Sequence, residues 1–200
     1  TGIATGIRRA IDWKGDDGKR VDVISLSLGG PQRHAGTVNN IVYGFSQGVQ
    51  TGAAAGNSGP GPRTEGWPAR DPEVPSIAAM SEDGSVARFS SRGGILVGCP
   101  GHHILSADHR SRTAKRFMSG TSMACPFYCG FMGNLIALRR ASGLPGWRSN
   151  EPVFNLLKNY AIDKGKPGYD DSSGHGVIDY SRLLKDIDLR GEKIFQDVAA

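Results

Sequence analysis

Apolar side chains along the first quarter of the chain recur with two different spacings. Over residues 2–13 they fall three and four positions apart, which predicts an amphipathic helix. Residues 21–28 are instead apolar in a near-continuous run, and this predicts a strand buried on both faces, as in a parallel sheet. A second stretch with helical spacing follows and ends near Gly48. Residues 49–55 are then predicted to form a second strand. This strand–helix–strand order indicates a right-handed βαβ crossover.

Short apolar runs between glycine- and proline-rich loops fill the middle of the chain. We expect short strands over residues 77–80, 95–97, 104–107 and 113–118. The apolar, proline-free stretch 127–141 predicts a long buried helix, and Asn150-Glu151-Pro152 is typical of the start of another. The whole pattern predicts an α/β fold, a three-layer αβα domain with a mainly parallel sheet.

The composition is that of one globular domain. Two hundred residues are enough to bury a core, and 38% hydrophobic with 22% charged residues is typical of globular rather than disordered chains. No apolar run reaches the length of a membrane-spanning helix, so we expect no membrane partner. The three cysteines are an odd number and do not form a disulfide framework. Cys125 and Cys129, four residues apart, could suit a metal, but no other ligand accompanies them, so we favour buried free thiols, Cys99 included.

The net charge of +5 raises the question of an anionic partner. Basic residues cluster at positions Arg110, Arg112, Lys115 and Arg116, with Arg139 and Arg140 further along. Such a patch could bind nucleic acid or a membrane surface, but stacking aromatic residues are not interleaved with it, apart from Phe117. A solvated basic loop is the favoured interpretation, and we expect no nucleic-acid partner.

The stretch 119–126, with sequence SGTSMACP, holds the candidate chemistry. Gly120 permits backbone geometry that a Cβ would forbid, and Pro126 is expected in the first turn of a helix, where its missing N–H costs nothing. Ser122 then lies where a turn becomes a helix, facing unpaired N–H groups that would stabilise an oxyanion. A serine at this position can also be a simple helix N-cap. The flanking glycine and proline favour the catalytic interpretation.

This stretch resembles the nucleophile motif of the subtilisin-like serine proteases, the subtilases. VDVISLSLGG at 21–30 resembles the substrate-binding strand of that family, and AAAGNSG at 53–59 its oxyanion-asparagine segment. The three motifs occur in the family's order. The resemblance runs from about residue 3 to about residue 184 and covers the later two-thirds of a subtilase catalytic domain. It implies that residues 1–187 are the C-terminal part of that domain, incomplete without the N-terminal part, and that 188–200 are a tail.

The resemblance also implies roles for individual residues. Ser122 would be the nucleophile, and the side-chain amide of Asn57 would join the Ser122 N–H as the second oxyanion donor; without the resemblance, Asn57 would be read as a turn asparagine. An extended substrate peptide would pair with one strand edge, and a specificity pocket would have a second wall and a base. The residues implied are Ser27, Leu28 and Gly29 for the edge, Ala54, Ala55 and Gly56 for the wall, and Gly66 for the base. The small residues of the wall predict room for a large apolar side chain.

The family's catalytic aspartate and histidine motifs are missing from these 200 residues. None of the histidines at positions His34, His102, His103, His109 and His175 has a matching context. Asp170 and His175 offer an aspartate and a His-Gly pair, but they follow the nucleophile and match the family's final glycine segment, so we reject them as a triad. Phe127 replaces a histidine that the family commonly has there in a structural role, and this leaves catalysis unaffected.

We therefore expect this chain to be one piece of a serine endopeptidase. A separate segment or chain, left associated after zymogen processing, would supply the aspartate and histidine, so this chain alone would be nearly inactive. The alternative is a subtilase-like pseudoenzyme that acts as a binding or structural subunit. Calcium is possible by family resemblance, but acidic residues such as Asp71, Glu73, Glu82 and Asp83 lack EF-hand spacing, so we assign no metal ligand. Secretion is the family default, although free cysteines count against it.

Overall fold

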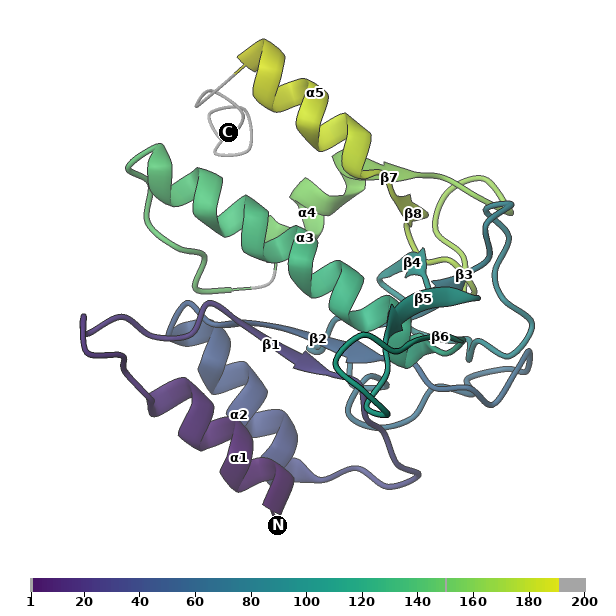
Figure 1. Ribbon diagram of the computed structural model, residues 1–200, viewed down its shortest axis with the longest axis horizontal. Helices are drawn as coiled ribbons and strands as arrows, with labels where there is room; N and C mark the ends of the chain where they lie inside the picture. Colours follow the sequence, from purple (N-terminus) through teal and green to yellow (C-terminus); the bar gives the residue numbers. More distant parts are fainter. Residues whose placement is uncertain (1, 150, 191–200) are drawn as a thin grey trace.

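A six-stranded sheet forms the middle layer of the computed structural model, which describes residues 2–149 and 151–190 (Figure 1). Its strands lie in the order β1 (Val23–Leu26), β2 (Gln50–Ala54), β3 (Ser76–Met80), β4 (Val97–Pro100), β8 (Val177–Ile178) and β7 (Ala161–Ile162). Every neighbouring pair is parallel except β7 and β8. The predicted, mainly parallel sheet is confirmed.

Helices cover both faces of this sheet (Figure 1). One layer consists of α1 (Gly2–Asp12) and α2 (Ala35–Ser46), and the other of α3 (Thr121–Ala141), α4 (Glu151–Tyr160) and α5 (Tyr180–Arg190). All residues of β2 and β3 are buried because helices pack on both sides of them. The predicted three-layer αβα fold is confirmed.

β1 is the edge strand of the sheet. Its residues alternate between the two layers, as strand geometry requires: Val23 packs with the α3 layer, and Ile24 and Leu26 pack with the α1–α2 layer. Val23 and Ile24 are only partly buried. Within the described residues, β1 has a partner strand, β2, on one side alone.

The sequence pattern missed some elements. β7 and β8 have two residues each, too few to show an apolar periodicity. The strands β5 (Ile104–Ala107) and β6 (Lys115–Met118), by contrast, were predicted; their pairing as an antiparallel hairpin outside the main sheet was not. α5 continues to Arg190, so most of the predicted tail falls outside the described residues. Asn150, expected to cap α4, also lies outside them.

Pro126 lies in the second turn of α3, so our expectation that it would lie in the first turn is wrong. Proline has no N–H, and the carbonyl four residues earlier, that of Ser122, therefore loses its helical donor. The Ser27 hydroxyl donates to this oxygen at 2.8 Å and replaces the missing bond. α3 can begin at Thr121 and continue through Pro126 because a serine 95 positions away provides the donor.

In residues 2–149 and 151–190, no helix combines the length and the apolar character that a membrane crossing requires.

Candidate active site

Ser122 occupies the first turn of α3, directly after the N-cap residue Gly120 and Thr121. This confirms that Ser122 lies where a turn becomes a helix. Its hydroxyl donates to the carbonyl oxygen of Ser27 at 3.4 Å, while the Ser27 hydroxyl donates to the Ser122 carbonyl at 2.8 Å. The first of these hydrogen bonds is long and therefore weak, so the Ser122 hydroxyl can donate instead to a stronger acceptor.

Asn57 is fixed in one orientation by Thr121. The backbone N–H and the hydroxyl of Thr121 both donate to Asn57 Oδ1, at 2.9 and 3.1 Å. An N–H can only donate, so it must face the amide oxygen, and Nδ2 is left as the free end of the side chain. The Thr121 hydroxyl in turn accepts from the Gly56 N–H at 3.1 Å. The asparagine is therefore oriented by the helix that carries Ser122.

Two N–H donors converge on the space beside Gly120. A Cβ placed on Gly120 would lie 3.6 Å from Asn57 Nδ2 and 3.7 Å from the Ser122 backbone nitrogen. The Ser122 N–H belongs to the first turn of α3, whose amides have no acceptor within the helix and lie at the positive end of its dipole. Glycine at position 120 leaves this space open, and an oxyanion there could accept from both donors.

A pocket of about 650 Å³ opens beside Ser122 and Asn57. Most of the residues predicted for substrate binding line it: Ser27, Leu28, Gly29, Ala54, Gly56 and Gly66. Gly66 lies close against the segment that follows β1, because a Cβ on Gly66 would lie 3.3 Å from the Gly30 carbonyl oxygen. β1 and β2 are parallel neighbours, so the segments that follow their carboxyl ends meet at this pocket.

Ala55 is not among the residues that line the pocket. Its side chain is buried with those of Ala78 and Ile95, and its carbonyl oxygen accepts from the Gly66 N–H at 2.9 Å. Since neighbouring residues of an extended segment point to opposite sides, Ala54 and Gly56 line the pocket and Ala55 does not. Ala55 therefore positions Gly66 through its backbone.

Sequence analysis missed three charged residues of this pocket, Arg63, Glu65 and Arg70. They come from a loop rich in glycine and proline, where charged side chains are usually solvated. Glu65 is instead buried, at 3% exposure. No pattern in the sequence marks it, because its burial depends on residues that are distant in the chain.

Four of the five histidine rings contact groups other than Ser122: His102 contacts Ser81, His103 stacks on Phe117, His109 contacts Asp108 and His175 contacts Tyr169. His34 is the N-cap residue of α2. In the described ranges 2–149 and 151–190, no histidine ring hydrogen-bonds to the Ser122 hydroxyl. The proton acceptor that a serine nucleophile needs is not found in this part of the chain.

The rejected pair of Asp170 and His175 does not form a catalytic arrangement with Ser122. The Asp170 carboxylate accepts hydrogen bonds from Ser172 and Ser173 within its own turn. His175 lines a different pocket, together with residues of α2 and α4. Burial lowers the pKa of His175, which favours its neutral form.

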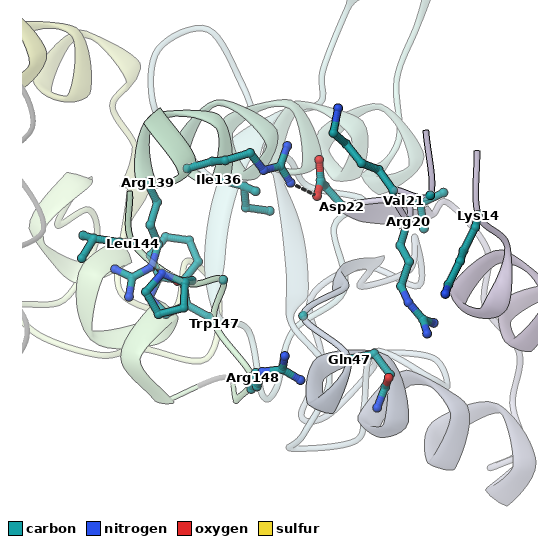
Figure 2. A pocket seen from close by; sticks show the side chains of 16 residues that line it. Lys14, Arg20, Val21, Asp22, Gln47, Ile136, Arg139, Leu144, Trp147 and Arg148 are labelled. Carbon is teal, nitrogen blue, oxygen red and sulfur yellow. Dashed lines mark hydrogen bonds and ion pairs between the residues drawn. The ribbon is translucent and has the colours of Figure 1, made fainter. Parts of the chain in front are cut away.

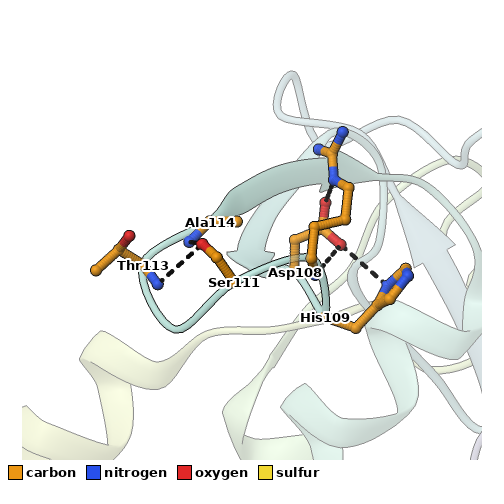
Figure 3. A network of polar contacts seen from close by, with 6 residues as sticks. Asp108, His109, Ser111, Thr113 and Ala114 are labelled. Atoms are coloured by element: carbon orange, nitrogen blue, oxygen red, sulfur yellow. Dashed lines mark hydrogen bonds and ion pairs between the residues drawn. The ribbon is translucent and has the colours of Figure 1, made fainter.

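The basic residues found in the sequence divide between two places. Arg110 and Arg112 belong to the tip of the β5–β6 hairpin, where Arg110 and His109 both pair with the buried carboxylate of Asp108 (Figure 3). Arg139 is in the last turn of α3, a helix of 21 residues that starts where the hairpin ends. The two groups therefore do not form one basic patch.

A second pocket, of about 500 Å³, lies at the amino end of β1 and the carboxyl end of α3 (Figure 2). Its charged lining consists of one acid, Asp22, and the bases Lys14, Lys19, Arg20, Arg139, Arg140 and Arg148. Arg140 pairs with Asp22 at 2.5 Å. β1 separates this pocket from Ser122, which lies near the strand's other end.

The three cysteines are free and buried, as predicted. The Cys125 thiol donates to the Gly52 carbonyl at 3.2 Å, and the Cys129 thiol approaches the Ile24 carbonyl at 3.8 Å. Burial raises the pKa of Cys99. The side-chain hydrogen bond between Cys129 and Cys125 raises the pKa of Cys129 and lowers that of Cys125. In the described chain, no three His, Cys, Asp or Glu side chains are grouped so as to hold a metal ion.

Comparisons with known proteins agree with one another. A sequence model described as the Subtilase family matches residues 1–176. M-protease of Shouchella clausii (strain KSM-K16) is 33% identical over 166 residues, which are 82% of this chain and 40% of M-protease. Subtilisin Savinase of Lederbergia lenta is 33% identical over 82% of this chain and 57% of its own. The solved structure of Sphericase superimposes with a TM-score of 0.76 at 30% identity, covering 89% of this chain and 63% of that one. The chain thus spans less than two thirds of each of these relatives.

Proposed function

Because this chain belongs to the subtilase family, we propose that it is the nucleophile-bearing part of a subtilisin-like serine endopeptidase. Ser122 attacks the carbonyl carbon of the scissile peptide bond, and its proton passes to a base. The oxyanion that forms accepts hydrogen bonds from Asn57 Nδ2 and from the Ser122 N–H. When the oxyanion collapses, the C–N bond breaks and the amine leaves with the proton that the base had taken from Ser122. The acyl group remains on the Ser122 oxygen as an ester until water, deprotonated by the same base, hydrolyses it and restores the hydroxyl.

The convergence of these groups is the observation that carries the proposal. The Asn57 amide nitrogen and the Ser122 backbone nitrogen lie within 3.6 and 3.7 Å of one point beside Gly120. The amide cannot turn around without breaking both of its bonds from Thr121. Donors that are fixed before the reaction need no reorganisation when the oxyanion forms, and this is the main source of their catalytic effect.

We propose that a separate segment or chain supplies the catalytic aspartate and histidine. Two observations support this. No histidine ring in the described residues reaches the Ser122 hydroxyl, whose acceptor, the Ser27 carbonyl at 3.4 Å, is too weak to act as a base. The outer edge of β1 is also unpaired in the described chain and adjoins Ser27, so a strand added there would end near Ser122. The active protein is then a heterodimer or a longer chain.

The substrate is proposed to be an extended peptide segment of a protein. Ser27, Leu28 and Gly29 follow β1 and line the pocket, so their main-chain groups can pair with a peptide in a strand-like manner. The side chain next to the scissile bond then enters the pocket of about 650 Å³. The expected extracellular location belongs to the same proposal, and it rests on the family resemblance alone.

Hydrolysis of a denatured protein such as casein by the native protein tests this function. We expect peptide release by the wild type and none above background for Ser122→Ala. A matched variant, Ser106→Ala, changes an exposed serine of β5 that does not line this pocket and should retain activity. Equal release by wild type and Ser122→Ala would overturn the proposal. A native protein that is inactive and whose partner segment lacks the aspartate or the histidine would establish the pseudoenzyme alternative instead.

A further inference from the structure

The pocket at the amino end of β1 and the carboxyl end of α3 concentrates the positive charge of this protein (Figure 2). Six basic side chains and one acidic side chain, that of Asp22, line it, so the lining has a formal net charge of +5. The whole chain has the same formal net charge, and the remainder of the chain is therefore formally neutral. A volume of about 500 Å³ is typical of sites that bind small molecules.

The basic side chains come from three segments that are far apart in the sequence. The α1–β1 connection contributes Lys14, Lys19 and Arg20, the last turn of α3 contributes Arg139 and Arg140, and the α3–α4 connection contributes Arg148. Figure 2 shows Arg20, Arg139 and Arg148 on different sides of the pocket. The fold therefore brings positive charge to the pocket from several directions.

Neutral groups hold two of these guanidinium groups in place. Arg20 Nη1 donates to the Ile11 carbonyl at 2.8 Å, and Arg148 Nη1 donates to the Ser46 carbonyl at 3.0 Å. Among the described residues, neither arginine pairs with a carboxylate. A carbonyl fixes a guanidinium group without neutralising its charge, and a guanidinium has five N–H donors. Arg20 and Arg148 therefore keep both charge and donors for a ligand.

Arg139 is positioned by its own segment of chain. Its guanidinium lies over the Trp147 ring, 4.7 Å from the ring centre, and its Nε donates to the Pro145 carbonyl at 2.6 Å. Burial lowers the pKa of Arg139. An anion next to this partly desolvated cation would favour the charged form again.

The negative groups near the pocket offset only part of its charge. Asp22 pairs with Arg140 at 2.5 Å, and Asp17, outside the lining, pairs with Lys19 at 2.8 Å. The carboxyl ends of α2 and α3 both reach the pocket, and each helix end adds the equivalent of about half a negative charge. Together the two helix ends amount to about one negative charge, so the pocket remains strongly positive.

We propose that this pocket binds a small polyanion that carries two or more phosphate groups. Guanidinium groups are planar and bind phosphate oxygens through paired N–H donors. Because Arg20, Arg139 and Arg148 lie on different sides of the pocket, an anion with more than one charged group satisfies them best. Its binding also relieves the repulsion among the like charges of the lining. This site lies apart from Ser122 and does not depend on the proposed endopeptidase function.

Calorimetry of the native protein with inorganic tripolyphosphate as the probe tests the proposal. We expect saturable binding by the wild type at physiological ionic strength. Arg148→Gln should bind at least about tenfold more weakly, because it loses charge-assisted hydrogen bonds to the probe. Arg20→Gln combined with Arg148→Gln should abolish binding.

Arg112→Gln is the matched control. It also removes one positive charge, but from the β5–β6 hairpin, which leads into the opposite end of α3. A helix of 21 residues is about 30 Å long, and salt screens a charge at such a distance. This variant should therefore bind tripolyphosphate as the wild type does.

Thermal melting gives a second readout and a control for folding. Tripolyphosphate should raise the Tm of the wild type and of Arg112→Gln, because a ligand that binds the folded state stabilises it, and should leave the Tm of the double variant unchanged. Equal weakening by Arg148→Gln and Arg112→Gln would overturn the proposal, because the probe would then respond to net charge and not to this pocket. Absence of binding would overturn it too, as would tighter binding of single-stranded DNA at equal phosphate concentration.

Discussion

The two ends of α3 carry pockets of comparable size but different chemistry. At the amino end, a pocket of about 650 Å³ is lined by Ser122, Asn57 and Glu65, and the side chain of Glu65 has no exposed surface. At the carboxyl end, a pocket of about 500 Å³ has six basic residues and one acidic residue in its lining (Figure 2). The second pocket has more charge, but only the first of the two combines the proposed nucleophile with donors in fixed positions. Volume and charge therefore do not identify the end of this helix at which we propose that the reaction occurs.

The difference lies in what each charged or polar group contacts. At the carboxyl end, guanidinium groups are held by backbone carbonyls, Arg139 by that of Pro145 at 2.6 Å and Arg148 by that of Ser46 at 3.0 Å. Arginines there also offset the negative end of the helix dipole. At the amino end, Asn57 is held through its oxygen, and its nitrogen remains available. At the carboxyl end of α3, these guanidinium groups have hydrogen-bond partners. At the amino end, the Asn57 amide nitrogen remains available to donate to a bound group.

Asn57→Ala at the amino end should have the largest effect of the four substitutions considered. We expect kcat of the active protein to fall roughly 100- to 1,000-fold, the range known for removal of one oxyanion donor from a subtilisin, with KM little changed. Steady-state kinetics measures this. The substitution also removes the Asn57 oxygen that accepts from Thr121, which lowers stability, so the melting temperature is recorded as a control for folding. A change confined to KM would contradict the role given to Asn57.

Gly52→Ala changes a residue of β2 that packs against the middle of α3. It should reduce stability without altering the pocket at either end of α3. A Cβ there would lie 2.6 Å from Tyr128 Cδ1 and 3.0 Å from Cys129 Sγ, so the buried ring or the strand must move. We expect a loss of about 1–3 kcal/mol in the free energy of unfolding, measured with denaturant. Gly130→Ala is the matched control, because a Cβ there meets nothing within 4 Å. It should raise stability slightly through its helix propensity, by up to about 1 kcal/mol.

Ser27→Ala tests how α3 tolerates a proline near its amino end. Removing the hydroxyl leaves the Ser122 carbonyl without a donor, and we expect a loss of about 1 kcal/mol. In a Pro126→Ala background the helix regains its own N–H donor, so the same substitution should cost less. A double-mutant cycle measures the difference. Equal costs in both backgrounds would show that the two sites act independently.

Arg140→Ala at the carboxyl end should have the smallest effect. Its ion pair with Asp22 is exposed, with 57% and 41% of the two side chains accessible, so it contributes about 0.2–1 kcal/mol and is screened by salt. Unfolding at low and high ionic strength measures this. We expect kcat/KM to stay at the wild-type value. A large loss of activity would mean that the carboxyl-end pocket takes part in the reaction.

The sequence predicted the elements whose burial is regular. Residues of α1 and α2 at helical spacing, and the apolar runs of β1 and β2, face their packing partners as the pattern indicates. The strands β7 and β8 were not predicted, because a strand of two residues is too short to show an alternation of apolar and polar positions. Pro126 was assigned to the wrong turn of α3. The Ser27 hydroxyl replaces the helical hydrogen bond that proline cannot donate to the Ser122 carbonyl, and the sequence pattern does not reveal this contact between residues 95 positions apart.

The same limit applies to the candidate site. Motif resemblance led to Ser122, to Asn57 and to half of the residues that line the pocket, because all of these except Gly66 lie in three short, ordered segments. It did not separate Ala55, which faces the core, from its neighbours that face the pocket. Glu65 could not be predicted at all, since its burial is created by Gly93 and Gly94, nearly thirty residues away in the chain.

Intact-mass analysis of the native protein with a fluorophosphonate probe tests most directly whether this chain holds the nucleophile and depends on a base from elsewhere. We predict one adduct on this chain when the segment with the aspartate and histidine is present, none in Ser122→Ala, and almost none when this chain is isolated and folded. An adduct that persists in Ser122→Ala would contradict the assignment of the nucleophile. Equal labelling of the isolated chain and the native protein would contradict the dependence on a second segment.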